Sequence, residues 1–225
     1  VLTFNDDEGK EVFRHSAAHV LAIALRRVFP DSKLTIGPPI DDDFYYDIDV
    51  DKPLTPEDLQ KLESEMKKVV KEDLAFERKE VEKETAIEII KENQPGNEYK
   101  LEMVDELGDE QITIYDHGTS EKKELRDLCR GPHVPSTSKV KAVKLLKVSG
   151  AFWRGDAKNK QLQRIYGVAF PNKDELKEYL KMLEEAEKRN HRKIGKQMDL
   201  IMFHEFSPGA PYFLPKGTRI YTQLA

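Results

Sequence analysis

The sequence predicts an α+β fold in which helices pack against a mixed or antiparallel sheet. Two observations carry this prediction: apolar residues recur at helical spacing in a few long segments, and short runs rich in β-branched and aromatic residues lie between them. A chain of 225 residues is also long enough to bury a core without a disulfide or a metal staple. No internal repeat or low-complexity tract is visible, so repeat architectures are excluded.

The first fifty residues predict a hairpin, a helix and two strands. Residues 1–4 and 10–13 flank a turn-forming segment and are expected to pair with each other. A helix is expected from about residue 14 to residue 29, because its apolar residues recur three and four positions apart before Pro30. Strands are expected at 35–40 and 44–48, on either side of an acidic turn at 41–43.

The clearest helix signal begins at Thr55. Threonine is a good N-cap, Pro56 fits the first turn, and Glu57 and Asp58 suit the positive end of the helix dipole. Further along we expect strands at 76–79, 111–115, 143–148 and 162–170, a helix at 83–91, a loop at 93–97, a long helix at about 174–193, extended segments at 200–206 and 212–214, and a last element beginning near 218.

The composition excludes a membrane protein and a disulfide-rich one. Mean hydropathy is −0.67, and the longest strongly apolar stretch, residues 20–25, is far shorter than the ~20 residues that span a bilayer. Cys129 is the only cysteine, which excludes an internal disulfide framework and a Cys-rich structural zinc site. Without a secretory signal pattern, a cytoplasmic location is expected, and valine at position 1 suggests a piece of a longer protein.

Charge is distributed unevenly along the chain. Residues 1–110 carry a net charge of −14, whereas residues 111–225 carry +9. Within the second half, residues 130–173 hold ten Lys and Arg against one Asp, with aromatic residues among them. Cations neutralise phosphates and aromatic faces stack on unpaired bases, so this segment predicts a surface that binds nucleic acid. The alternative is an ordinary solvated surface of strands and loops.

Two short patterns contain the candidate reactive residues. His15 and His19 are one helical turn apart, so both imidazoles are expected on one face of the first helix. Cys129 is followed four residues later by His133, and Gly131-Pro132 between them predicts a tight loop rather than a helix. Structural histidines at a helix end and a buried, inert cysteine are the alternatives.

These residues supply three imidazoles and one thiol, with Asp127 beside them, and two chemistries can use that set. His15, His19, Cys129 and His133 offer an acceptable zinc shell, either as three histidines with the cysteine or as two histidines with the cysteine and a water. Alternatively, histidines without a metal can orient and deprotonate a water while neighbouring donors stabilise an oxyanion. A position for His15 in the first helical turn would favour its neutral form through the helix dipole, which suits either chemistry.

Several longer segments resemble the editing domain of threonyl-tRNA synthetases. They are HSAAH at 15–19, IGPPI at 36–40, FYYD at 44–47, DLCRGPH at 127–133, GAFWRGD at 150–156 and QRIYG at 163–167. NHRKIGKQ at 190–197 is similar to the segment that joins that domain to the class II synthetase core. The two histidine-containing patterns also resemble those of alanyl-tRNA synthetase editing domains, which typically hold zinc, whereas the threonyl family is usually thought to activate its water without metal.

The resemblance implies hydrolysis of the ester in seryl-tRNA formed on threonine tRNA. It implies that His15, His19, Cys129 and His133 surround the ester and the water. It further implies that Asp127 holds the ammonium or hydroxyl of the amino acid, and that Tyr46 and Lys100 bind the terminal adenosine and stabilise charge. The water-activating base is expected to be one of the histidines or to lie near Lys100. A missing methyl group discriminates serine from threonine by only ~1–3 kcal/mol, which is why a second, editing site is needed.

The resemblance also implies a domain organisation and the partners of a parent enzyme. Residues 1–173 would be the editing domain, 174–198 a linker helix, and 199–225 the beginning of a class II catalytic domain. The parent would ligate threonine to its tRNA using ATP, with Mg and a further zinc, and would be a homodimer. The synthetic motifs would lie beyond residue 225, so no aminoacylation is expected from this chain alone. The partners expected are the acceptor end of tRNA mischarged with serine and the rest of the synthetase, with no membrane.

Two other function classes stay open at this stage. One is a zinc-dependent hydrolase of a different ester. The other is a non-catalytic module that binds tRNA, in which the His/Cys cluster is merely structural.

Overall fold

The computed structural model describes residues 2–40, 43–108, 111–119, 121 and 123–224. The chain divides into two compact units, Val1–Leu176 and Lys177–Ala225, which are described separately. Both combine helices with antiparallel strands, which confirms the predicted α+β class.

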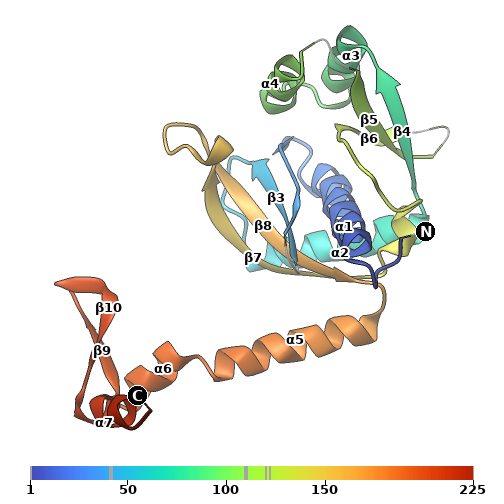
Figure 1. The fold of residues 1–225 in the computed structure, drawn as a ribbon. Coiled ribbons are helices and arrows are strands. Elements are labelled where there is room, and N and C mark those ends of the chain that lie inside the picture. Colours follow the sequence, from blue (N-terminus) through green and yellow to red (C-terminus); the bar gives the residue numbers. More distant parts are fainter. Residues whose placement is uncertain (1, 41–42, 109–110, 120, 122, 225) are drawn as a thin grey trace. The chain divides into compact units, whose positions relative to one another are not determined.

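The larger sheet of the first unit is antiparallel and has β3 (Asp43–Asp49) and β8 (Gln161–Phe170) at its centre (Figure 1). β7 (Ala142–Phe152) pairs with the outer side of β8, while β1 (Lys33–Leu34) and β2 (Pro39–Ile40) pair with different parts of β3. The predicted strands at 44–48, 143–148 and 162–170 all lie in this sheet.

A second sheet contains β4 (Ala75–Val81), β5 (Ile112–Gly118) and β6 (Lys123–Leu128), again antiparallel. Helices α3 (Lys83–Asn93) and α4 (Glu98–Glu106) accompany it (Figure 1). A small apolar core that includes Ile90, Val104 and Ile114 joins α3 and α4 to this sheet. The sequence predicts neither β6 nor α4, because charged residues interrupt the regular spacing of apolar residues in both segments.

Helix α1 (Asp7–Val28) contacts both sheets, since it packs on β3 and also meets β6. All its residues from Ser16 to Leu25 are buried. A polar side chain on a helix that is buried on every side is costly unless it finds a hydrogen-bond partner. His19 is such a residue, and its place inside the unit follows from this burial.

The predicted hairpin over residues 1–13 is wrong, because α1 begins at Asp7 rather than near residue 14. The helical period continues backwards through Phe13 and Gly9, and Asp7 and Glu8 suit the positive end of the dipole. Before the helix, Thr3 turns back and donates its backbone N–H to the Asp6 carboxylate at 2.7 Å.

The strand predicted over residues 35–40 is also wrong as a continuous element. Only β1 and β2 form, because Gly37-Pro38-Pro39 interrupts the ladder and the two prolines lack an N–H to donate. The acidic turn predicted at 41–43 lies partly outside the described residues. In contrast, α2 (Pro56–Glu72) follows its prediction, with a capping box between Thr55 and Asp58.

The second unit consists of two helices and a β-ribbon in its described residues, besides most of α5 (Lys173–Lys188), which begins in the first unit. α6 (His191–Gln197), β9 (Ile201–His204), β10 (Ser207–Phe213) and α7 (Pro215–Leu224) follow. A single helix through residue 193 was predicted, but Asn190 ends it by accepting the N–H of Arg192 at 3.1 Å as the N-cap of α6. In the part of the chain described, every helix is too short or too polar to cross a membrane.

Candidate active site

The site forms where α1 meets the segment that follows β6. α1 carries His15 and His19 one turn apart, with ring centroids 5.1 Å from each other. Asp127 lies near the end of β6, and Cys129 and His133 follow in the loop. More than a hundred residues of sequence separate the two histidines of α1 from this loop, and the packing of α1 against the second sheet closes that separation.

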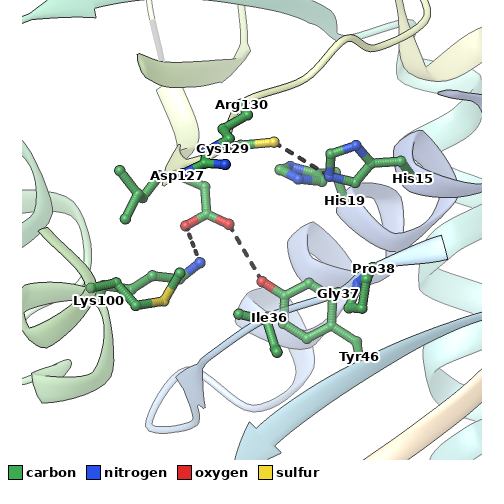
Figure 2. A pocket seen from close by; sticks show the side chains of 12 residues that line it. His15, His19, Ile36, Gly37, Pro38, Tyr46, Lys100, Asp127, Cys129 and Arg130 are labelled. Carbon is green, nitrogen blue, oxygen red and sulfur yellow. Dashed lines mark hydrogen bonds and ion pairs between the residues drawn. The ribbon is translucent and has the colours of Figure 1, made fainter. Parts of the chain in front are cut away.

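The thiol of Cys129 lies between the imidazoles of His15 and His133, and Figure 2 shows its contact with His15. Its Sγ is 3.3 Å from Nε2 of His15 and 3.2 Å from Nε2 of His133, and it accepts the backbone N–H of Gly131 at 3.3 Å. One donor atom from each of His15, His19, Cys129 and His133 lies within 4.8 Å of the others. Cys129 is therefore a member of a polar cluster and is not packed only among apolar side chains.

Beside this cluster is a pocket of about 260 Å³. It is lined by residues of α1, β3, α4, the end of β6 and the loop that follows β6. Lys100 and Asp127 also line this pocket and form an ion pair of 2.7 Å in which both side chains are only 2% exposed. The hydroxyl of Tyr46 donates to the other carboxylate oxygen at 3.4 Å (Figure 2). Of the seven predicted site residues, six line this pocket, and His133 lies behind Cys129.

Burial keeps the cluster uncharged at neutral pH. It lowers the pKa of His15 to about 4 and that of His133 to about 2, and it lowers the pKa of His19 as well, with the neighbouring imidazoles adding to the effect on the last two. Burial also raises the pKa of the Cys129 thiol to about 12. The predicted role of the helix dipole on His15 is wrong, because α1 begins at Asp7 and His15 lies in its third turn.

Two residues that contact the cluster were missed by the sequence analysis. The sequence patterns give no role to His117, on β5, yet it is fully buried and its Nε2 is 2.9 Å from Nδ1 of His19. The Oγ atom of Ser16 is 3.1 Å from Nδ1 of His133. No pattern in the sequence links His117 to the helix 98 residues earlier, whereas Ser16 stands inside the HSAAH segment itself.

The basic segment 130–173 is less available for nucleic acid than its composition suggests. Trp153 is buried edge-on against Tyr99, with ring centroids 5.0 Å apart, so it cannot stack on a base. Several of the cations are paired with acidic side chains from the first half of the chain: Lys144 with Glu63, Arg154 with Glu102 and Glu106, Lys160 with Asp49, and Arg164 with Asp47. Arg130, by contrast, lines the pocket.

The four-residue cluster fits a zinc ion by the chemistry of its donors. Three imidazole nitrogens and one thiolate form an accepted tetrahedral set, and bond lengths of about 2.0–2.3 Å place such ligand atoms roughly 3.5 Å apart. The two contacts of Cys129 at 3.2 and 3.3 Å are close to that spacing. All four of His15, His19, Cys129 and His133 would hold the ion in a closed shell, whereas Cys129 with two of the histidines would leave a position for a water on which the ion would act as a Lewis acid. In either case the thiol would have to lose its proton first.

Two comparisons with known proteins identify related sequences. Residues 112–166 match the family model described as the threonyl and alanyl tRNA synthetase second additional domain. Threonine–tRNA ligase of Clostridioides difficile is 54% identical over 222 residues, which are 98% of this chain and 34% of that protein. Threonine–tRNA ligase of Symbiobacterium thermophilum is 50% identical over 225 residues, which are 100% of this chain and 34% of that protein.

The matched residues 112–166 contain Asp127, Cys129 and His133, whereas His15 and His19 lie outside them. The likeness to the ligases extends over almost the whole chain and therefore includes both halves of the cluster. The chain spans about a third of the length of the curated relatives it matches. On this evidence the sequence belongs to the threonyl-tRNA synthetase family, in the region that contains the second additional domain.

Proposed function

We propose that this chain hydrolyses the ester that joins serine to the tRNA for threonine. The observation that supports this function best is the juxtaposition, at one pocket, of uncharged histidines from α1 with Cys129 and with the buried Lys100–Asp127 pair. Uncharged imidazoles can accept a proton from water, and a buried ammonium can stabilise an anionic oxygen.

The reaction needs three elements, and each has a candidate in the pocket. His15 or His19 takes the proton of the attacking water, because burial keeps both bases unprotonated at neutral pH. Lys100 stabilises the developing oxyanion, and Asp127 both positions Lys100 and receives the ammonium or hydroxyl of the amino acid. The Tyr46 hydroxyl donates to the same carboxylate and lines the pocket, where it would contribute to binding the terminal adenosine.

Editing by such a pocket solves a problem that the synthetic site cannot solve alone. Serine lacks one methyl group of threonine, and that difference is worth only ~1–3 kcal/mol in a synthetic site. A second pocket that accepts serine and excludes the larger threonine removes the error.

A second candidate is a zinc-dependent hydrolase of this or another ester. It is favoured by one observation, the convergence of four zinc-competent donors within 4.8 Å. Cys129 and two of the histidines would then hold the ion, a water would occupy its fourth position, and the reaction would stop when the ion is removed.

The rest of the proposed context belongs to the longer relatives. The partners would be the acceptor end of the tRNA and the remainder of a synthetase, which would ligate threonine with ATP and Mg and act as a homodimer. Residues 1–173 would be the editing domain, 174–198 the linker, and 199–225 the start of the class II catalytic domain.

The test compares the deacylation of seryl-tRNA and threonyl-tRNA, both on threonine tRNA, by the purified chain. Seryl-tRNA is expected to be deacylated at least about tenfold faster than threonyl-tRNA, which is the discrimination one methyl group can supply. Alanine at His19 should slow the reaction by about 10²–10⁴-fold if a positioned base is lost. His204→Ala, in the second unit, is the matched control and should change nothing.

The same assay with a chelator separates the two candidates. Activity that survives the chelator supports metal-free hydrolysis, whereas parallel loss of activity and of stoichiometric zinc supports the zinc enzyme. If the chain binds tRNA but hydrolyses neither ester, the cluster is structural and the proposal is wrong.

A further inference from the structure

Two side chains that do not line the pocket contact Nδ1 of His19 and Nδ1 of His133. His117 from β5 is one of them, and Ser16 from α1 is the other. Both are fully buried, and each donates its one hydrogen to a backbone carbonyl. Each can therefore only accept in its contact with the imidazole of His19 or His133.

His117 has a role that its backbone partner determines. Its Nδ1 is 3.1 Å from the carbonyl oxygen of Leu125, and a carbonyl only accepts, so Nδ1 carries the proton. A neutral imidazole has one N–H, so Nε2 of His117 is an acceptor. Nδ1 of His19, 2.9 Å away, must then donate, which leaves Nε2 of His19 as a free lone pair.

Ser16 reaches the same result for His133 by an independent route. The hydroxyl of Ser16 donates its one hydrogen to the carbonyl of Val12 at 2.8 Å. It accepts the backbone N–H of Val134 at 3.0 Å, and its remaining contact at 3.1 Å must also be an acceptance, from Nδ1–H of His133. Nε2 of His133, 3.2 Å from Sγ of Cys129, is therefore unprotonated.

We infer that His117 and Ser16 are positioning residues that fix the tautomers of His19 and His133, so that both rings offer the Nε2 lone pair to the cluster. The opposite tautomer of His19 would set two lone pairs against each other at 2.9 Å in a buried place, which is costly. A base or a zinc ligand needs that lone pair, and partners behind a ligating imidazole commonly fix its tautomer in this way.

The consequence for catalysis depends on the proposed function, whereas the tautomer assignment does not. Nitrogen NMR of the whole, ¹⁵N-labelled chain distinguishes protonated from unprotonated ring nitrogens directly. We expect Nδ1–H and bare Nε2 for both His19 and His133 at neutral pH. A wild-type chain in which Nε2 of either residue is protonated would overturn the inference.

Two substitutions of His117 form a matched pair. Glutamine places an acceptor near the former Nε2, so H117Q should keep the tautomer of His19. Asparagine reaches only the former Nδ1, so H117N keeps a partner for Leu125 but loses the acceptor for His19. We expect H117N, but not H117Q, to lose the Nδ1–H signature of His19 and to weaken zinc affinity, measured by chelator competition, by about 10–100-fold. S16A should do the same for His133.

Thermal unfolding of each variant controls for folding, and zinc affinity and deacylation are compared only among variants that melt cooperatively. Equal zinc affinity and equal tautomer spectra for H117N and H117Q would contradict the inference. If the NMR pattern holds but wild-type chain deacylates no seryl-tRNA, the proposed function fails and the positioning roles stand.

Discussion

At the scale of single residues, burial determines the chemical state of the site. Cys129 lies between two uncharged imidazoles. Burial and the nearby Asp127 carboxylate disfavour a thiolate there more strongly than the N–H of Gly131 and the charge of Lys100, which is itself paired with Asp127, favour it. The thiol therefore acts as a hydrogen-bond donor or, with zinc, as a ligand, and not as a free nucleophile. Reactive cysteines have the opposite environment, with cations or a helix N-terminus nearby.

The first prediction concerns the reactivity of this thiol. With a pKa of about 12, Cys129 should react with iodoacetamide at pH 8 on the order of 10³-fold more slowly than an ordinary cysteine, because only the thiolate attacks. As Cys129 is the only cysteine, mass spectrometry reports it without interference. Labelling in urea is the control and should be fast. Fast labelling of the folded, zinc-free chain would contradict the assigned protonation state.

A second prediction concerns acid stability. In the unfolded chain His117 has a pKa near 6.5, whereas burial lowers the pKa in the folded chain to about 4. Between pH 6.5 and about pH 4, His117 is protonated in the unfolded state but stays neutral in the folded state. The free energy of unfolding therefore decreases as the pH falls through this range. His117 alone should contribute roughly 2 kcal/mol of this loss between pH 7 and pH 5.

Urea unfolding at both pH values, in the presence of a chelator, measures this loss. H117F keeps a ring in the same space and cannot be protonated, so its stability should fall less than that of wild type over the same interval. An equal fall for the two proteins would show that His117 does not titrate in this way.

At the scale of elements, the loop after β6 depends on glycine. Gly131 has φ +66°, and an added Cβ would lie 2.1 Å from the hydroxyl of Tyr115, so it faces both a disfavoured backbone conformation and a clash. The same loop carries Cys129 and His133 on either side of this residue. The loop therefore needs a residue without a side chain at position 131, where its backbone packs closely against the ring of Tyr115 on β5.

The third prediction follows from that fit. Gly131→Ala should lower the free energy of unfolding by more than Gly96→Ala, because Gly96 has φ +73° but open space around its Cβ position. Gly96→Ala should cost about 1 kcal/mol from the backbone alone. Gly131→Ala should cost a further 1–3 kcal/mol, roughly, from the clash. Urea denaturation of the two variants measures their free energies of unfolding. Equal decreases would show that the loop accommodates the added methyl group at position 131 without strain.

At the scale of the whole molecule, the site and the core belong to one unit. Every residue of the cluster and the pocket lies in Val1–Leu176, and so do the three groups of buried apolar residues. The second unit has few buried side chains, and Phe206, Tyr221 and Leu224 are among its most exposed apolar residues.

The fourth prediction is that a chain ending at residue 188, after α5, folds by itself. Its urea unfolding should be a single cooperative transition, and its seryl-tRNA deacylation should match that of the full chain. The control is the full chain in the same assays. A truncated chain that is unfolded by circular dichroism would show that the first unit depends on residues beyond α5.

Part of this protein could be predicted from local sequence. The amphipathic stripe after Thr55 and the alternating strands at β7 and β8 predict their elements because the signal lies within a few consecutive residues. Local signals failed where a longer element overrode them: α1 absorbs the supposed hairpin, and Asn190 divides the supposed long helix.

The sequence by itself determined the α+β class, the motifs that mark the family, and the residue types able to form a polar cluster. Only the tertiary structure decided that α1 lies against the loop after β6, that His117 joins the cluster, and that Lys100 and Asp127 pair beneath the pocket. The reason is physical: contacts between residues about a hundred positions apart depend on which faces pack together, and the pKa of each group depends on the burial which that packing creates.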